Sequence, residues 1–206
     1  ANYSEGGYRD IDINSKIIAL KVTWITRLLD DNFHPCKTVP NYLCSNVGGV
    51  KIIFHLNLQL SKHCITKIKM FPKFYQELIK LWVNVSKKEP IGVPEIVKEV
   101  LWNNGMILSK NESLFNEYFI RKGIITIEDI INEHGEILAW SDIKDKFSLN
   151  NSYIMNWLGL IKCIPQVWKN EIMDNYNEIT MEVHKTSNVV SVTSKTAYEK
   201  IIAPLI

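Results

Sequence analysis

The stretch DIDINSKIIALKVTWITRLLDD, residues 10–31, carries the clearest structural signal in this chain. Its apolar side chains recur every three or four residues, which is the spacing of one helix face. Further apolar residues widen that face, as is typical of a helix packed between other elements. The residues that define the face are Ile13, Ile17, Leu20, Trp24 and Leu28. The stretch therefore predicts one long helix.

A second helix is predicted over residues 71–85, where Pro72 stands in the first turn and apolar residues again share one side. Proline, glycine and asparagine interrupt the rest of the chain at short intervals, so the remaining helices must be short. The segment Asn103-Asn104-Gly105 predicts a turn, and residues 106–111 predict a small hairpin. Short helices are predicted over residues 51–63, 94–102, 112–121, 126–133, 141–147, 150–163 and 165–175.

The predicted fold class is mainly α, an irregular array of short helices with at most one small hairpin, in a segment of a larger multidomain protein. No alternation of strands and helices typical of a parallel sheet is present in the sequence. Thr126 and Ser141 are expected to cap the helices that they begin. Four tryptophans are expected to anchor the core: Trp24, Trp82, Trp102 and Trp168.

Charge is distributed unevenly along the 206 residues, although the formal net charge is only +2. Residues 51–88 contain eight lysines and a single acidic residue, Glu77, which gives this segment a charge of +7. Residues 101–206 contain ten basic and thirteen acidic residues, which gives −3. The basic segment indicates a surface for phosphates, and its aromatic residues can stack on unpaired bases. Lysines beside aromatics also describe an ordinary amphipathic helix, so this alternative stays open. The aromatics are Phe54, Phe71, Phe74, Tyr75 and Trp82.

Catalytic and metal-binding motifs are not found in the sequence. It contains no phosphate-binding glycine loop, no Gly-x-Ser-x-Gly elbow and no His-Glu-x-x-His pair. Six potential zinc ligands fall within 31 residues, but they lack the paired spacing of a zinc knuckle. These six are His34, Cys36, Cys44, His55, His63 and Cys64. We therefore predict no catalytic residue and no metal ligand in this segment.

Seven short motifs follow one another in a characteristic order. Residues 5–12 read EGGYRDID and residues 19–29 read ALKVTWITRLL. This pair resembles the phrase that follows the polymerase domain in non-LTR (LINE-type) retrotransposon reverse transcriptases, although Tyr8 stands where leucine is more usual. The later motifs that match in order are residues 71–82 (FPKFYQELIKLW), 102–107 (WNNGMI), 122–135 (KGIITIEDIINEHG), 164–169 (IPQVWK) and 193–198 (TSKTAY).

The resemblance implies a region C-terminal to the polymerase domain and before the Cys/His zinc-binding region. The aromatic-x-Asp-Asp palm motif is absent, and Asp30-Asp31 is no candidate because it ends a helix. The parent family is an RNA-directed DNA polymerase that uses Mg²⁺ in its polymerase domain and Zn²⁺ further downstream. This segment itself is expected to hold no cofactor. Its expected regions are 1–32, the connecting turn and helix after the polymerase domain; 33–92, a basic helical region; 93–183, a helical region with short breaks; and 184–206, the truncated start of the next element.

The resemblance also implies partners for the basic segment. They are the element RNA, the RNA/DNA duplex and adjacent domains of the same polyprotein. No membrane and no small-molecule substrate is expected for this segment. The protein is expected in the cytoplasm and nucleus. The expected RNA contacts go to the backbone and read no sequence. Two other interpretations remain: a helical protein-interaction module without a nucleic-acid role, and a non-functional relic of such an element. The lysines expected to bind nucleic acid are Lys62, Lys67, Lys69, Lys73 and Lys80.

Overall fold

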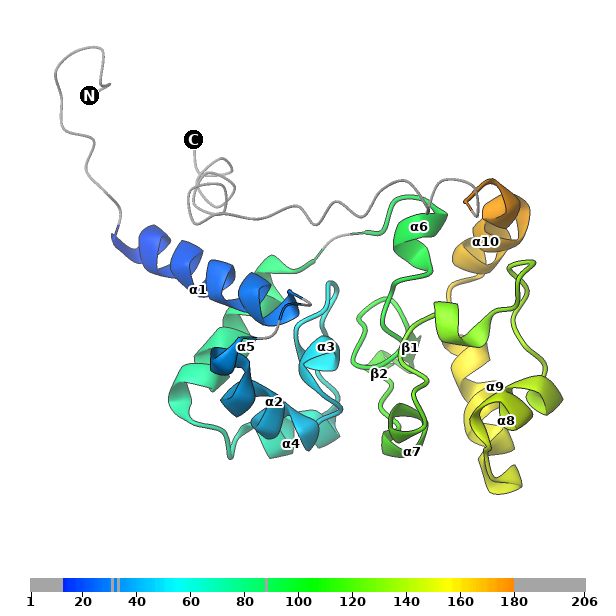
Figure 1. The fold of residues 1–206 in the computed structure, drawn as a ribbon, viewed down its shortest axis with the longest axis horizontal. Coiled ribbons are helices and arrows are strands. Elements are labelled where there is room, and N and C mark those ends of the chain that lie inside the picture. Colours follow the sequence, from blue (N-terminus) through cyan, green and yellow to red (C-terminus); the bar gives the residue numbers. More distant parts are fainter. Residues whose placement is uncertain (1–12, 31, 33, 88, 180–206) are drawn as a thin grey trace, which may run out of the picture. The chain divides into compact units, whose positions relative to one another are not determined.

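The computed structural model describes residues 13–30, 32, 34–87 and 89–179. They divide into two compact units, one holding the described residues up to 32 and the other those from 34 to 179. The described chain is mainly helical with one two-stranded hairpin, which confirms the predicted fold class (Figure 1). The predicted segment 184–206 lies outside the described residues.

The longer helices are α1 (Ile13–Leu29), α2 (Thr38–Ser45), α4 (Lys62–Ile68), α5 (Lys73–Val85), α8 (Trp140–Phe147), α9 (Ile154–Cys163) and α10 (Gln166–Ile179). The shorter elements are α3 (Val50–Ile53), α6 (Val93–Ile96), α7 (Glu117–Arg121), the 3-10 turns η2 (Pro35–Lys37), η3 (Glu128–Ile130) and η4 (Asn151–Tyr153), and strands β1 (Leu108–Ser109) and β2 (Glu112–Ser113).

Helix α1 confirms the long helix predicted over residues 10–31, but the predicted buried face is wrong in its N-terminal half, whereas Leu28 is buried as predicted. Ile13, Ile17 and Leu20 are exposed, with 70 %, 44 % and 52 % of their surface accessible. The buried side consists largely of small residues. Because α1 carries apolar side chains all round, periodicity alone cannot predict which side of the helix packs. The Thr23 hydroxyl is satisfied there by donating to the carbonyl oxygen of Ala19 at 2.9 Å. The buried residues of α1 are Ser15, Ala19, Thr23, Ile25 and Leu28.

A tight turn at Gly48 and Gly49 joins α2 to α3. Both glycines have positive φ angles, +96° and +107°, which residues with a side chain rarely adopt. A Cβ atom at Gly48 would stand 2.8 Å from the Ile52 Cδ1 atom and 3.3 Å from that of Ile120. The turn therefore lets α3 come close to residues far along the chain.

Changing Gly48→Ala is expected to lower the free energy of unfolding by about 2 kcal/mol, since it adds left-handed backbone strain to a steric clash. Gly49→Ala serves as the matched control, because nothing lies within 4 Å of a Cβ atom there and only the backbone strain remains. Urea unfolding monitored by circular dichroism measures both changes. Equal losses in the two variants would contradict the close approach at Gly48.

Helices α4 and α5 follow one another in the basic segment and are joined by a bend at residues 69–72. Ser61 caps α4 by accepting a hydrogen bond from the backbone N–H of Cys64 at 3.4 Å. Pro72 stands at the N-cap of α5, close to its predicted position, and Leu78, Ile79 and Trp82 are buried. The predicted helix over residues 71–85 is therefore confirmed.

The helix predicted over residues 51–63 is wrong beyond α3. From Phe54 the backbone leaves the helix, and its N–H groups bond to distant segments instead. The N–H of Asn57 donates to the carbonyl oxygen of Ser86 at 2.9 Å, and that of Gln59 donates to the carbonyl oxygen of Asn103 at 2.7 Å. Long-range pairing has replaced the local helical pairing that the ambiguous apolar pattern suggested.

Several other predicted helices are shorter than expected. Residues 97–102 do not continue α6, because Val100 pairs with Thr126 in a β-bridge. The helix predicted over residues 126–133 is reduced to η3. The Asp129 carboxylate accepts from the N–H groups of Ile125 and Thr126, both at 2.8 Å, so Asp129 rather than Thr126 organises this turn. The predicted Ser141 cap is also wrong, because α8 begins one residue earlier with Ala139 at its N-cap.

The hairpin predicted over residues 106–111 is present, slightly displaced. β1 and β2 pair in antiparallel fashion through Leu108 with Ser113 and Ser109 with Glu112. Lys110 and Asn111 have φ angles of 51° and 66°, the two positive values that a type I′ turn requires. Residues predicted as helix from 112 therefore begin with this strand, and α7 starts only at Glu117, where the Asn116 side chain caps it.

One apolar core unites α3 with the elements that follow α6, and α10 packs against α6. The indole N–H of Trp102 donates to the carbonyl oxygen of Ile124 at 2.7 Å, so this side chain is buried without an unmet polar group. Trp82, Trp102 and Trp168 are buried core anchors as predicted, whereas Trp24 of α1 is only half-buried. Hydrogen bonds from Gln59 and Ser61 to Asn103 also join the predicted regions 33–92 and 93–183, which pack together in one compact unit.

Candidate nucleic-acid interface

The five predicted lysines lie on α4, on α5 and in the bend between them. Lys62 begins α4, Lys67 lies in its last turn and Lys69 follows its end. Lys73 begins α5, and Lys80 lies two turns further on the same helix. The structure thus places all five within one supersecondary unit, but it gives them two different environments.

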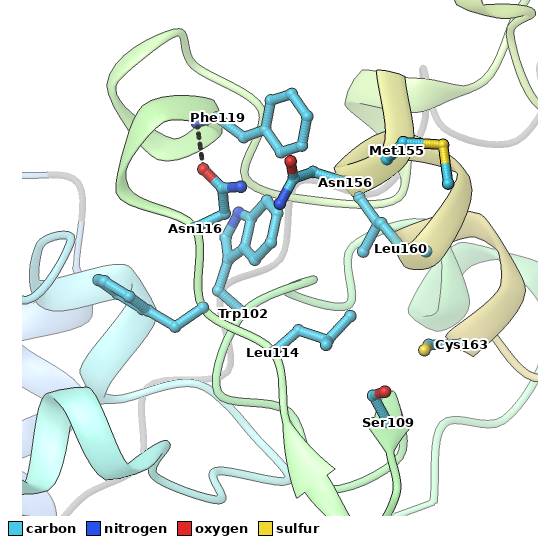
Figure 2. A pocket seen from close by; sticks show the side chains of 11 residues that line it. Trp102, Ser109, Leu114, Asn116, Phe119, Met155, Asn156, Leu160 and Cys163 are labelled. Carbon is cyan, nitrogen blue, oxygen red and sulfur yellow. Dashed lines mark hydrogen bonds between the residues drawn. The ribbon is translucent and has the colours of Figure 1, made fainter. Parts of the chain in front are cut away.

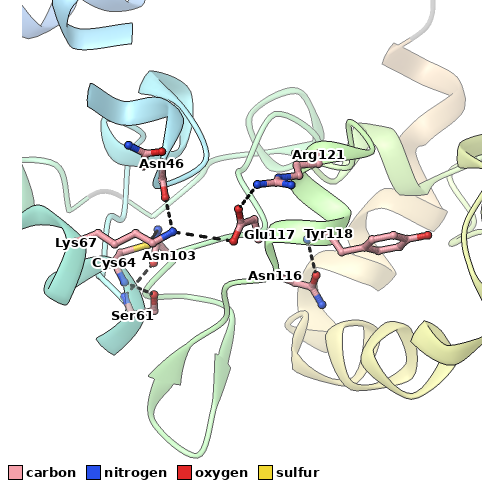
Figure 3. A network of polar contacts seen from close by, with 9 residues as sticks. All are labelled: Asn46, Ser61, Cys64, Lys67, Asn103, Asn116, Glu117, Tyr118 and Arg121. Atoms are coloured by element: carbon pink, nitrogen blue, oxygen red, sulfur yellow. Dashed lines mark hydrogen bonds and ion pairs between the residues drawn. The ribbon is translucent and has the colours of Figure 1, made fainter. Parts of the chain in front are cut away.

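Lys62 and Lys67 are engaged by acidic residues of the second half of the chain. Lys62 forms an ion pair with Glu112 of β2. The Lys67 Nζ atom donates to the carbonyl oxygen of Asn46 at 2.8 Å and lies 4.0 Å from the Glu117 carboxylate (Figure 3). Part of the +7 charge is therefore compensated within the fold, which weakens the prediction that these two lysines bind phosphate.

Glu117 itself is shared between two cations. Its other carboxylate oxygen accepts from Arg121, one turn later on α7, at 2.6 Å. Figure 3 shows Glu117 between Lys67 and Arg121, with Asn46 on the far side of the Lys67 ammonium. All these groups are exposed or partly exposed, so each pair contributes only a few tenths of a kcal/mol in water. Their main effect is to fix where the Lys67 side chain points.

Lys69, Lys73 and Lys80 are exposed, and none of them forms an ion pair with another residue that the structure describes. Lys73 and Lys80 lie seven residues apart on α5 and therefore share one face. Lys69 stands at the bend between the helices, where Met70 is 86 % exposed. We call residues 69–74 the α4–α5 corner.

Hydrogen bonds from α5 hold the corner in place. The Gln76 side-chain amide donates to the carbonyl oxygens of Lys69 and Phe71, at 3.2 Å and 2.7 Å. Phe71 is buried beneath the bend, whereas Phe74 is 46 % exposed beside Lys73. The corner therefore presents two cations and an aromatic ring on a fixed backbone.

Three of the five aromatics considered for base stacking belong to the core instead. Phe54, Phe71 and Trp82 are buried, with at most 8 % of their surface accessible. Phe74 and Tyr75 reach the surface and meet edge to face, with ring centroids 5.3 Å apart. Burial, followed by the nearby Cys44 and Cys36, raises the pKa of Tyr75, so this phenol stays protonated at neutral pH. Of the five aromatics, these two are the ones that solvent reaches.

A buried polar hub lies beside the interface and was not anticipated from the sequence. Asn103 is completely buried, accepts from the Ser61 N–H at 2.9 Å and donates to the Cys64 sulfur at 3.3 Å (Figure 3). Asn104, also completely buried, donates to the Glu99 carboxylate and to the carbonyl oxygen of Val100, both at 2.8 Å. The Asn-Asn-Gly signal predicted a turn, but it gave no sign that both amides would be buried.

The candidate zinc ligands lie in unlike surroundings. Burial raises the pKa of the Cys44 thiol to about 12 and also raises that of Cys64. Burial lowers the pKa of His55 to about 4, whereas exposed His63 stacks on Phe115 with ring centroids 5.0 Å apart. In the described part of the chain, no three His, Cys, Asp or Glu side chains converge in the manner of metal ligands.

Comparison of the chain with models of protein families, with curated proteins and with solved structures gives no match in any of the three. Among the described helices, none has both the length and the apolar composition that crossing a membrane requires.

Proposed function

We propose that this chain binds the phosphate backbone of RNA at the α4–α5 corner, as a non-catalytic connecting region of a non-LTR retrotransposon reverse transcriptase. The observation that carries the RNA-binding part is the arrangement of Lys69, Lys73 and Lys80. All three are exposed and have no ion-pair partner among the described residues. Lys69 and Lys73 lie in the corner together with exposed Phe74, and Lys80 shares a face of α5 with Lys73. Such cations gain affinity by releasing counterions from the nucleic acid, and they do so without reading its sequence.

Placement in a reverse transcriptase is supported by the structural positions of the motif residues. Trp102, Ile107, Ile124, Ile164 and Trp168 belong to three of the motifs, and all of them are buried in the core. The motif residues that match are thus largely those that determine the fold. A resemblance in such residues supports a shared architecture, whereas the activity must be argued from the surface.

Sequencing the gene on both sides of this segment tests that placement. The proposal expects an aromatic-x-Asp-Asp motif upstream and a Cys/His cluster downstream. An intact open reading frame that contains neither motif would contradict the placement and would leave the RNA-binding proposal to its own test.

The RNA-binding proposal predicts a large effect of charge reversal at the corner and at Lys80 on the adjoining face of α5. The triple variant Lys69→Glu, Lys73→Glu, Lys80→Glu should bind a hairpin RNA at least tenfold more weakly. The slope of log affinity against log salt should fall by about 2, because three phosphate contacts are lost. Filter binding at several salt concentrations measures both quantities.

A second triple variant supplies the control, with Lys98, Lys144 and Lys162 changed to glutamate. It alters the net charge by the same amount but leaves the corner intact, so it should keep most of the affinity. Equal losses in the two triple variants would show that only net charge matters and would overturn the assignment of the corner. A cooperative thermal melt of the unaltered chain would argue against a relic that no longer folds.

A protein-interaction role is the second candidate, and one observation favours it. Helix α9 exposes Ile154, Met155 and Leu158, three apolar residues in little more than one turn. Exposed apolar groups gathered in this way mark interaction sites more often than scattered ones do.

A further inference from the structure

A small cavity lies between α9 and the segment that leads from Trp102 to α7. Its volume is about 230 Å³, and its inner wall is formed by the buried side chains of Trp102, Phe119 and Leu160. Figure 2 shows Met155 and Asn156 of α9 on one side of it and Asn116 on the other. Pockets for drug-sized ligands are typically about 300–1,000 Å³, so this cavity is suited to a single apolar side chain.

The exposed face of α9 continues into this cavity. Met155 and Leu158 are 72 % and 52 % exposed, and Met155 also lines the cavity. Gly159 lines it too, is exposed, and has nothing within 4 Å of the position that a Cβ atom would occupy. A second helix can therefore approach the α9 backbone closely at Gly159 while one of its side chains enters the cavity.

The stretch of chain that contains α9 carries charges of one sign. Residues 149–170 contain two lysines, Lys162 and Lys169, and no acidic residue. The Lys169 Nζ atom donates to the carbonyl oxygen of Ile161 at 2.6 Å, which fixes one cation at the C-terminal end of α9. Exposed Lys110 directly follows Ser109, which lines the cavity on the hairpin side. Two carboxylates also lie on this side, Glu112 opposite Ser109 and Glu117 after Asn116, but both are engaged by cations of the chain itself. The uncompensated charge beside the apolar face is therefore positive.

We infer that α9 is the docking site for an acidic amphipathic helix of a partner protein, which inserts one large apolar side chain into the cavity beside Gly159. The spacing of Met155, Leu158 and Lys162 matches the three- and four-residue spacing at which a facing helix presents its anchors. Carboxylates beside those anchors complement the lysines. A second copy of this chain fits less well, because two α9 helices would bring lysines together without a carboxylate between residues 149 and 170. This site uses none of the residues of the α4–α5 corner, so it does not depend on RNA binding.

Two labelled synthetic peptides test the inference on the full 206-residue chain. Both are amphipathic helices with the same leucine and phenylalanine positions, but one has glutamates beside them and the other has lysines. Fluorescence anisotropy should show at least tenfold tighter binding of the glutamate peptide, and added salt should reduce this difference. Equal binding of the two peptides, or no binding of either, would overturn the inference.

Variants locate the binding on the molecule. Leu158→Asp on α9 should lower the affinity for the glutamate peptide at least tenfold. Gly159→Leu should lower it by the same factor, because the leucine side chain would keep the peptide helix away from the α9 backbone. Val167→Asp is the control, because Val167 is likewise an exposed apolar residue, 72 % against 52 % for Leu158, but lies on α10 and not on the proposed docking face of α9. Unchanged affinity in Leu158→Asp would contradict the site. A dimer in sedimentation that Leu158→Asp disrupts would instead identify a second copy as the occupant and overturn the acidic partner.

Discussion

Replacing Asn103 with alanine is expected to lower the free energy of unfolding by about 3 kcal/mol. The amide satisfies the buried N–H of Ser61 and donates to the Cys64 sulfur, and both bonds are lost. Leaving a buried donor without a partner costs about 1–3 kcal/mol. The φ angle of Asn103 is also +52°, a conformation that asparagine tolerates better than alanine does.

Asn111→Ala provides the matched control for this change. Asn111 also has a positive φ angle, +66°, but it is exposed in the hairpin turn. Its substitution introduces similar backbone strain without breaking a buried hydrogen bond, so it should cost about 1 kcal/mol. Urea unfolding of both variants measures the difference, and equal losses would show that the hub amide contributes nothing beyond its backbone conformation.

Acid is expected to remove about 3 kcal/mol of stability from the folded chain through His55 alone. Burial lowers the folded-state pKa of this residue from 6.5 to about 4, and the backbone of Leu56, Asn103 and Trp102 opposes that shift without cancelling it. The unfolded chain therefore binds a proton at a higher pH than the folded chain does. The contribution of neutral His55 is present above pH 6.5 and is lost as the pH falls towards 4.

Unfolding measurements at pH 7.0, 5.5 and 4.5 check this expectation. His55→Asn cannot take up the proton, so its stability should decline less steeply with acid than that of the unaltered chain, whatever its stability at pH 7. The control is His134→Asn, because His134 is exposed on a turn and should leave the steep decline in place. Parallel pH profiles for the unaltered chain and His55→Asn would rule out His55 as the source.

Long helices with a sustained period could be predicted from the sequence, and irregular segments could not. Residues 13–29 and 73–85 are helical as expected, because their local preferences and their packing agree. In residues 54–61 and 97–102, local preference was overruled by pairing with segments tens of residues away. Asn57 bonds to Ser86, and Val100 pairs with Thr126, neither of which is visible in a short window of sequence.

The candidate site could be predicted only in outline. The sequence located the lysines in the basic segment 51–88, but it did not predict α4, and it could not show that Glu112 and Glu117 would engage Lys62 and Lys67. These ion pairs join residues about fifty positions apart, so they depend on the completed fold. The apolar face of α9 was missed for a related reason, since exposure of Leu158 is decided by how the neighbouring helices pack.

The four cysteines make the native chain suitable for spectroscopic labelling without added thiols. Cys44 and Cys64 are buried and their pKa values are raised, so little of either thiol is ionised at neutral pH. Cys36 is exposed, and partly exposed Cys163 lines the cavity beside α9. Spin labels attached to these two sites would lie in one compact unit and give a distance within it. The label at Cys163 would lose mobility when a side chain fills the cavity, whereas the label at Cys36 would report the reference mobility in the same sample.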